Sequence, residues 1–539
     1  MKLYHLSGSP GKVVSPRKFH VMLCGLALVF AAKIVCIALF AGWAPYWDQW
    51  GAEGLYLYKP YLEGTLSFDD FTRAHNEHRI MIPRLLDILV LELRGAWDTK
   101  LQMIVNSALC VLALGVLCYM LLSRLEHGDS LVFISFVTVF AAIPYSWENT
   151  LSGFQSQFHF VLLFSLLAIW SVGSSRVGSR FWLFGFACAW CAVFSSGSGS
   201  LTHVLLAVLS GLQYIFSNRR GWRELLGIAA FVASFIGSLA LIVHVPGHDV
   251  LKAQGAAQFV HALVWAQSWP LSGSSALSWF VGAPAALVLS APVVLIALTV
   301  LRDRPTRGDW RWLVVGLAGW GALQVMSLAY GRALSPVAPR YLDTIAINVI
   351  VGAAAVLWLI RNNPKRTGVV ALGLVWFAVV IVGVGGQMRL AVDGAISRGG
   401  IVATHERNVR DYVVTGNVNA LAVPKGADPH NHIPFPSPQF LKARLDDPTI
   451  RSILPPALNP QHTYEAVGNN LAFGAVLAGF FAGVRDLVLD NAWELFAMTA
   501  VSFALMLAYS ASLALSADLR RRTSDEEQLP NAQRRVGSS

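Results

Sequence analysis

Charged residues are scarce in this chain of 539 residues. Only 13% of the residues are Asp, Glu, Lys or Arg, and 55% are hydrophobic, whereas soluble globular proteins carry about a quarter charged residues. The charges gather in short clusters between apolar runs of about 17–25 residues, the length that a bilayer requires. This composition argues against an ordinary soluble domain and predicts a polytopic helical membrane protein.

Several functional signatures are also missing. The chain has no P-loop and no GxGxxG between a strand and a helix, so it shows no sign of a nucleotide-binding fold. It has no internal repeat, and no basic face with interleaved aromatic residues that would indicate a nucleic-acid partner. No small-residue cleavage site follows the first apolar run, which we therefore interpret as a retained signal anchor.

Cysteine is rare as well. None of the six cysteines lies in a predicted outer loop, so no disulfide framework is indicated. Cys188 and Cys191 form a CxxC pair, but the flanking tryptophans and alanines place it within a membrane span. Buried small side chains are therefore favoured over metal or redox chemistry.

Window hydropathy predicts an all-α fold with about twelve transmembrane helices. The predicted spans are 20–42, 101–122, 131–145, 157–173, 181–196, 200–216, 225–245, 277–301, 312–330, 342–360, 367–388 and 493–516. Arg and Lys fill alternate short loops, which is the positive-inside pattern, and the net charge of +10 reports this topology. An even number of spans places both termini in the cytoplasm.

The chain divides into a membrane part and a few longer segments. We expect a cytoplasmic N-terminus (1–19), a transmembrane domain (20–390), a periplasmic cap (391–490), a last transmembrane helix (491–517) and a disordered cytoplasmic tail (518–539). The outer loop 43–100 is rich in Trp, Tyr and Leu at helical spacing, which favours helices lying in the membrane interface. Whether the apolar stretch 471–483 is re-entrant, surface-lying or spanning stays open.

The outer loop begins with the sequence PYWDQWGAEGL, in which Trp47 and Trp50 flank Asp48. Charged groups at membrane level are costly and usually functional. Asp48 is therefore either a solvated loop charge or a carboxylate held at the membrane surface for chemistry.

The same loop contains the sequence HNEHR, from His75 to Arg79. If this stretch is helical, His75, His78 and Arg79 share one face through their i, i+3, i+4 spacing, and Glu77 points elsewhere, towards Asp48. His and carboxylate side chains can bind a divalent cation, but the spacing is not HExxH. We assign no metal site here and treat a divalent cation as an open alternative.

A second polar cluster lies in the sequence PYSWENTLSGFQSQFHF, which begins at Pro144. Glu148, Asn149, Gln155 and Gln157 would be costly if they faced lipid, so they are expected to line a cavity. Carboxylates, amides and aromatic rings suit a hydroxyl-rich ligand such as a sugar. The alternative is a polar hairpin tip that caps two helices.

A third cluster, GRALSPVAPRY, contains Arg332, Arg340 and Tyr341. Arg340 heads the next predicted span, where a guanidinium and the helix dipole can together bind phosphate oxygens. The alternative is contact with lipid headgroups or a surface ion pair. Lys33 lies inside the first span and receives no catalytic role, and His248 has no companion in the sequence and is interpreted as structural.

The acid after the first span, the second acid Glu77 in a large outer loop and the late cap resemble the GT-C superfamily of polyprenyl-phosphate-sugar-dependent glycosyltransferases. The resemblance covers the topology and about the first hundred residues. It implies a multi-pass protein of the bacterial inner membrane, with an active site facing the periplasm. The donor would be a polyprenyl-phosphate sugar in the membrane lipid, and the acceptor a glycan or a protein.

The resemblance also implies roles for individual residues. Asp48 would be the general base, Glu77 and His78 would position the substrates, and Arg79 or Arg340 would neutralise the leaving phosphate. The remaining candidates for substrate binding are Trp47, Trp50, Tyr341, Glu148, Asn149, Gln155 and Gln157. Gln49 replaces the second adjacent acid of the family pattern, which argues against metal dependence, so no cofactor is assigned and a divalent cation stays an open alternative. The alternatives are a lipid-linked glycan flippase or exporter, and an O-antigen ligase or polymerase using a polyprenyl-diphosphate donor.

Overall fold

The computed structural model describes residues 14–217, 220–273, 275–461 and 474–536, without the side chains of 475 and 517–536. The predictions for residues 1–13, 471–473 and 537–539 and for the side chains of the tail fall outside this description. Within it the protein is helical, apart from one two-stranded hairpin.

Ten helices in the described part are long and apolar enough to cross a membrane. They are α1 (Pro16–Phe40), α5 (Thr99–Leu122), α8 (Ser156–Ser174), α10 (Ser200–Phe216), α11 (Trp222–Leu239), α13 (Trp279–Asp303), α14 (Trp310–Gly331), α15 (Leu342–Asn362), α16 (Thr367–Thr415) and α21 (Ala492–Val536). The predicted spans 131–145 and 181–196 correspond to the shorter apolar helices α6 (His127–Ala142) and α9 (Arg180–Val193). The prediction of a multi-pass helical membrane protein is therefore confirmed.

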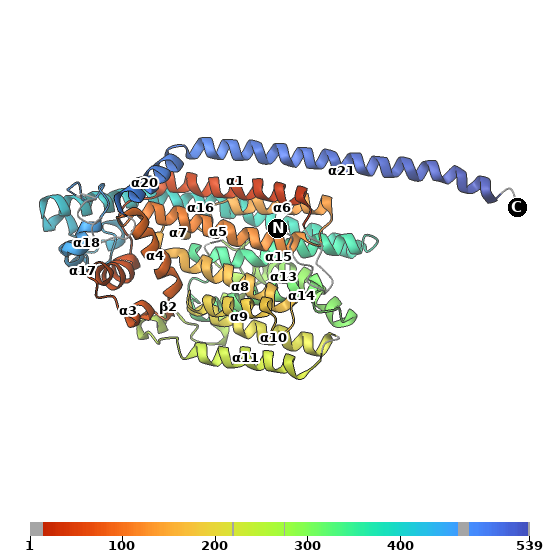
Figure 1. Cartoon of the computed structure of the whole chain (residues 1–539), viewed down its shortest axis with the longest axis horizontal. Coiled ribbons are helices and arrows are strands. Elements are labelled where there is room, and N and C mark those ends of the chain that lie inside the picture. Colours follow the sequence, from red (N-terminus) through yellow and green to blue (C-terminus); the bar gives the residue numbers. More distant parts are fainter. Residues whose placement is uncertain (1–13, 218–219, 274, 462–473, 537–539) are drawn as a thin grey trace.

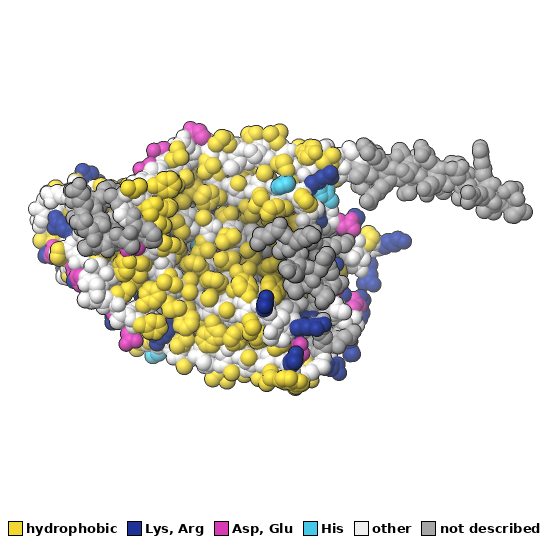
Figure 2. All heavy atoms as spheres, viewed as in Figure 1, with side chains coloured by type: hydrophobic (Ala, Val, Ile, Leu, Met, Phe, Trp, Pro, Cys, Tyr) yellow, Lys and Arg dark blue, Asp and Glu magenta, His cyan; other side chains and the backbone are white. Residues whose placement is uncertain are grey.

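The long helices run side by side, and the remaining elements gather at one end, which we call the cap end (Figure 1). Figure 2 shows apolar side chains over the middle of the bundle and charged side chains mainly towards its two ends. Several apolar side chains are strongly exposed, among them Phe280 (93%) and Leu287 (72%). A belt of this kind is stable only where lipid covers it.

Helix α15 lies inside the bundle because it is apolar on all sides. Its buried residues follow one another without the polar stripe of a surface helix, from Ile345 to Val356. Short elements join the spans: α7 (Trp147–Thr150), η2 (Gly153–Gln155), η3 (Gly197–Gly199), η4 (Pro246–Leu251), α12 (Ala256–Gln267) and η5 (Pro339–Tyr341).

The first outer segment folds as a short chain of small elements at the cap end. They are η1 (Trp50–Tyr58), α2 (Lys59–Leu62), α3 (Phe68–Thr72), β1 (Ala74–His75), β2 (His78–Arg79) and α4 (Met81–Arg94). Helix α4 turns Leu85 and Leu89 outwards and Arg84 and Asp87 inwards. This is the reverse of a helix in water and fits a helix whose apolar side meets the lipid surface.

The cap and the first outer segment share one hydrophobic core. Trp50 and Trp97 from the first segment pack in it with Ile453 and Leu454 from the cap. The cap elements are η6 (Val418–Leu421), η7 (Pro429–Asn431), α17 (Pro438–Leu445) and α18 (Pro448–Ile453). The two segments therefore stabilise each other, although more than 300 residues separate Trp97 from Ile453.

Helix α16 connects the membrane part to the cap without a break. The sequence predicted a span at 367–388, but the helix continues to Thr415 and carries the start of the predicted cap segment. After the cap, α20 (Gly474–Asp490) includes most of the stretch 471–483, and α21 follows as the last span. The backbone of α21 remains helical through Val536, in the region predicted as a disordered tail.

Candidate functional site

Asp48 lies in a tightly folded loop at the cap end of α1. The Trp50 indole Nε1–H donates a hydrogen bond to the Pro45 carbonyl at 2.8 Å, and the Gln49 side chain accepts one from the Tyr46 N–H at 3.0 Å. The Trp50 ring is fully buried and packs in the hydrophobic core of the cap end; its predicted role in substrate binding stays a prediction. These bonds fix the loop and leave the Asp48 side chain 35% exposed.

The partner of Asp48 is His75. Their carboxylate and imidazole atoms, Oδ2 and Nε2, are 3.5 Å apart, and the His75 ring meets the Phe154 ring edge-on. Beside them Trp47 stacks on His430 of the cap, with ring centroids 3.8 Å apart. Asp48 therefore lies within ion-pair distance of an imidazole, at the junction of the first outer segment and the cap.

The HNEHR sequence is a β-hairpin and not a helix, so the predicted shared helical face is wrong. Ala74 pairs with Arg79 and His75 with His78 in an antiparallel register. Asn76 takes a left-handed backbone conformation (φ 50°), which Asn tolerates better than most residues, and so closes the two-residue turn.

Glu77, in the hairpin turn, faces away from the position predicted for it near Asp48. Its Oε1 lies 2.6 Å from Nδ1 of His248 and 3.6 Å from Nη2 of Arg332. Burial opposes ionisation of this carboxyl, but the hydrogen bond from His248 and the nearby positive charges hold its pKa below the usual value. His248, which the sequence showed without a companion, is thus an ion-pair partner contributed by η4.

His78 and Arg79 attach the hairpin to the bundle. The His78 Nδ1 accepts a hydrogen bond from the Gly197 N–H at 3.2 Å, and burial lowers the pKa of this imidazole to about 4. His78 is therefore neutral near pH 7. Arg79 donates to the backbone carbonyls of Thr72 and Leu241 at 2.8 and 3.2 Å. These bonds use two of the guanidinium N–H groups that the sequence analysis assigned to phosphate binding.

Arg340 and Glu148 form an ion pair, with Nη1 and Oε2 3.1 Å apart. Tyr341 lies under the Arg340 guanidinium, whose carbon is 5.1 Å from the ring centroid. The buried Asn149 donates to the Arg340 carbonyl at 3.0 Å and to Asp343 at 2.8 Å. Glu148 and Asn149, from the second predicted polar cluster, thus contact Arg340 of the third cluster directly.

Arg398 is a candidate that the sequence prediction missed. Its guanidinium carbon lies 3.5 Å from the centroid of the Tyr46 ring, and the side chain is only 8% exposed. In the part of the chain described here, no carboxylate forms an ion pair with Arg398, and Glu148 acts on it at longer range. The sequence did contain a usable signal, which is the helical spacing of residues 391, 395, 398, 405, 409 and 412. The structure buries these residues along one side of α16. The signal was missed because the predicted helix ended at 388.

Gln155 and Gln157 lie at the cap end of α8, and each has a buried side-chain oxygen without a hydrogen-bond partner among the described residues. Buried polar atoms of this kind generally bind water or a ligand. The two amides do not line either of two small cavities that lie between the helices in the described part of the chain.

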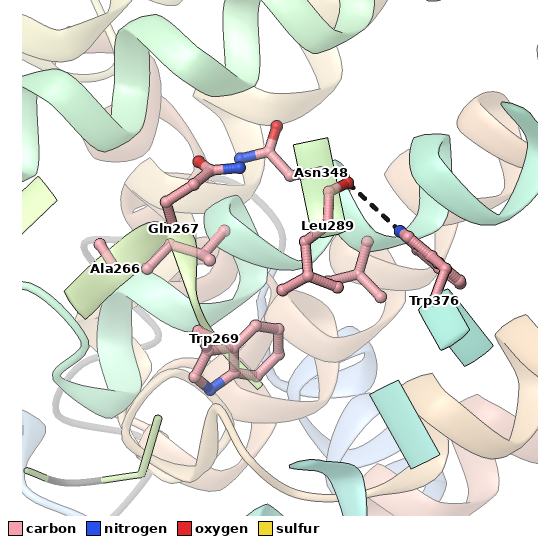
Figure 3. Close-up of a pocket in the computed structure, with 8 residues that line it drawn as sticks. Ala266, Gln267, Trp269, Leu289, Asn348 and Trp376 are labelled. Carbon is pink, nitrogen blue, oxygen red and sulfur yellow. Dashed lines mark hydrogen bonds between the residues drawn. The ribbon is translucent and has the colours of Figure 1, made fainter. Parts of the chain in front are cut away.

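Those two cavities are too small for a sugar. One, of about 10 Å³, is lined by Gln267, Trp269, Asn348 and Trp376, and the amide ends of Gln267 and Asn348 point towards each other (Figure 3). The other, of about 30 Å³, is lined by Lys33, Cys110, Tyr145 and Asp343. A single water needs about 10–15 Å³, so these spaces fit one or two waters.

Two buried carboxyl groups, Glu53 and Asp87, lie beneath the Asp48 loop. Glu53 accepts hydrogen bonds from four donors, the side chains of Gln49, Tyr58, Trp97 and Gln102. Burial raises the pKa of Glu53 to about 7 against these bonds, and burial together with the Glu53 charge raises the pKa of Asp87 well above its usual value. Since four donors stabilise the charge of Glu53, Asp87 is the carboxyl of the two that more readily holds a proton.

The raised pKa of Asp87 predicts an unusual pH dependence of the stability of the protein. A raised pKa in the folded state means that the contribution of Asp87 to stability is complete below its unfolded pKa of about 3.9 and is lost as the pH rises, by about 1.4 kcal/mol per unit. The Asp87→Asn variant has no carboxyl proton to lose. The difference in thermal stability in detergent between this variant and the wild type should therefore shift in favour of the variant as the pH rises from 5 to 8. Glu53→Gln, which turns an amide N–H towards the donors, should destabilise throughout. Parallel curves for Asp87→Asn and the wild type would contradict this assignment.

The chain matches no protein-family model, and searches of curated proteins and of solved structures give no match either. The chemistry of the cap end is therefore the basis on which a function can be proposed.

Proposed function

We propose that the protein is a membrane glycosyltransferase that moves a sugar from a polyprenyl-phosphate donor to a glycan or protein acceptor at the cap end. The observation that carries this proposal is Arg398, a buried guanidinium without a carboxylate ion pair in the described chain, held over Tyr46. Tyr46 is two residues from Asp48. An anion bound by Arg398 over Tyr46 would share the cap end with the acid Asp48.

The reaction follows from these roles. Asp48, supported by His75, would remove the proton from the acceptor hydroxyl, and the acceptor oxygen would form a new bond to the anomeric carbon. The bond between that carbon and the phosphate oxygen breaks, and the leaving group is the polyprenyl phosphate. Arg398 and Arg340 would stabilise the charge that develops on that phosphate. A single displacement inverts the anomeric centre.

The surface of the protein supports a donor that arrives through lipid. The apolar belt ends beside the cap, and the outward-facing Leu85 and Leu89 of α4 lie on the first outer segment. The connection between α13 and α14 carries Arg302, Arg304 and Arg311, and it lies at the end of the bundle away from the cap (Figure 1). By the positive-inside rule that end is cytoplasmic, which would place the cap on the periplasmic side of a bacterial inner membrane.

The experiment that tests the function uses purified protein in proteoliposomes with a radiolabelled polyprenyl-phosphate sugar and a mixture of envelope acceptors. Appearance of labelled acceptor supports a transferase. Movement of the labelled lipid between leaflets without a new product would support a flippase. Transfer from a polyprenyl-diphosphate oligosaccharide alone would support a ligase.

Arg398→Gln is expected to weaken binding of the donor by about 10- to 150-fold, because a hydrogen bond between charged groups contributes about 1.5–3 kcal/mol. Binding of polyprenyl phosphate itself, measured by thermophoresis, checks this without an acceptor. The matched control is Arg389→Gln on the same helix, since Arg389 is 87% exposed and pairs only with Asp393 at 3.8 Å among the described residues. Equal losses in the two variants would argue against a phosphate site at Arg398.

A further inference from the structure

One group of side chains within the membrane part has the composition of a metal site. Donor atoms of Cys110, His159 and Asp343 lie within 4.8 Å of one another, the one such group of His, Cys and acid side chains among the described residues. His159 is 2% exposed and its Nδ1 has no hydrogen-bond partner there. His75, Glu77 and His78 of the hairpin do not form such a group.

Lys33 supplies the positive charge at this place. It lines the 30 Å³ cavity together with Cys110 and Asp343, and it interacts electrostatically with both of them and with His159. Its Nζ also lies 3.4 Å from the Thr150 hydroxyl. An ammonium and one carboxylate balance each other, whereas a divalent cation added beside Lys33 would leave excess positive charge in a medium of low dielectric.

We propose that Lys33 is a tethered cation that fills a Cys110–His159–Asp343 site and excludes a metal ion from it. The site would accept a thiophilic divalent cation once the ammonium is removed, because Cys, His and carboxylate are the side chains that bind zinc and cobalt.

The site lies under α7, which gives the tethered cation a positioning role. Asp343 accepts hydrogen bonds from Ser146 and Asn149 at 2.7 and 2.8 Å, and Lys33 contacts Thr150. These contacts hold both ends of the short helix that carries Glu148, the partner of Arg340. This positioning role rests on the proposed function only through Arg340. The proposal that Lys33 occupies the Cys110–His159–Asp343 site does not depend on the proposed function.

The test measures thermal unfolding of the full chain in detergent with Co²⁺ as the probe. We expect Lys33→Ala to unfold at a lower temperature than the wild type, and Co²⁺ to raise the midpoint of the variant but not of the wild type. A thiolate-to-cobalt absorption band should appear in Lys33→Ala and disappear in Lys33→Ala/Cys110→Ser. Lys33→Arg, which keeps the cation, should show no band.

Two results would overturn the proposal. One is a cobalt–thiolate band in the wild type, which would show that a metal and Lys33 share the site. The other is a folded Lys33→Ala protein that ignores Co²⁺. If Lys33→Ala does not fold, the charge-neutral double variant Lys33→Met/Asp343→Asn provides the test. It should be recovered folded where Lys33→Met is not, and equal failure of both would contradict the charge balance between Lys33 and Asp343. Polyprenyl-phosphate binding plays no part in these readouts, so their failure is distinct from failure of the proposed function.

Discussion

Asp48→Asn is expected to lower the rate of sugar transfer by about 10²–10⁴-fold, the usual contribution of a positioned general base. The amide keeps the size of the carboxylate but cannot take the proton of the acceptor hydroxyl. Donor binding should change little, because the phosphate is assigned to Arg398 and Arg340. Single-turnover transfer and polyprenyl-phosphate binding on the same protein preparation separate the two effects.

The folded state should tolerate this substitution. The Asp48 side chain is 35% exposed and its ion-pair partner is His75 at 3.5 Å, so the change in stability should stay within about 0.5 kcal/mol. Asp69→Asn is the matched control, an exposed acid of the same outer segment, and should leave transfer unchanged. His75→Gln should give an intermediate loss and shift the pH profile of transfer. Full turnover by Asp48→Asn would remove Asp48 from the mechanism.

Asp98→Ala is expected to produce the largest loss of stability, about 3–5 kcal/mol, which is typical when one partner of a buried ion pair is removed. Asp98 is 1% exposed, and its Oδ2 accepts from Arg94 Nε at 2.7 Å and pairs with Arg485 of α20. Its other oxygen accepts the Leu101 N–H at 3.0 Å and so caps α5. One carboxylate thus joins α4, α5 and α20. Its removal takes a shared anion from two buried guanidinium groups, of which Arg485 keeps its second ion pair, with Asp486 at 2.6 Å.

Asp309→Ala is the matched control for that prediction. Asp309 also caps a membrane helix and pairs with an arginine, Arg311, but its side chain is 31% exposed. Loss of an exposed cap costs about 1 kcal/mol, and solvent screens the ion pair. Thermal or denaturant unfolding in detergent compares the two variants. Similar losses for Asp98→Ala and Asp309→Ala would show that the network around Asp98 adds nothing beyond capping.

The sequence predicted the membrane spans well because hydropathy is a local property and the bilayer sets the length of a span. All twelve predicted spans coincide with apolar helices, ten of them long enough to cross. Two local features were misjudged. HNEHR carries a two-residue turn at Asn76, and α16 continues past 388 because a polar helix can leave the membrane without a break.

The candidate site was predicted in its residue types but not in its pairs. Asp48, Glu77, Arg340 and Glu148 all lie at the cap end, yet Glu77 pairs with His248, 171 residues away, and Arg398 covers Tyr46 from a helix near the other end of the chain. The residue pattern within one segment carries no information about contacts with a segment so far away in the sequence.

Composition and hydropathy alone determined that this chain crosses a membrane many times and exposes polar clusters beyond its spans, because each apolar run must find lipid or protein wherever it lies. Only the tertiary structure decided which acid meets which base. Polar pairs such as Glu77–His248 and Arg340–Glu148 depend on how elements distant in sequence pack side by side. That packing is set by the sum of many apolar contacts, and the polar pairs are brought together by it.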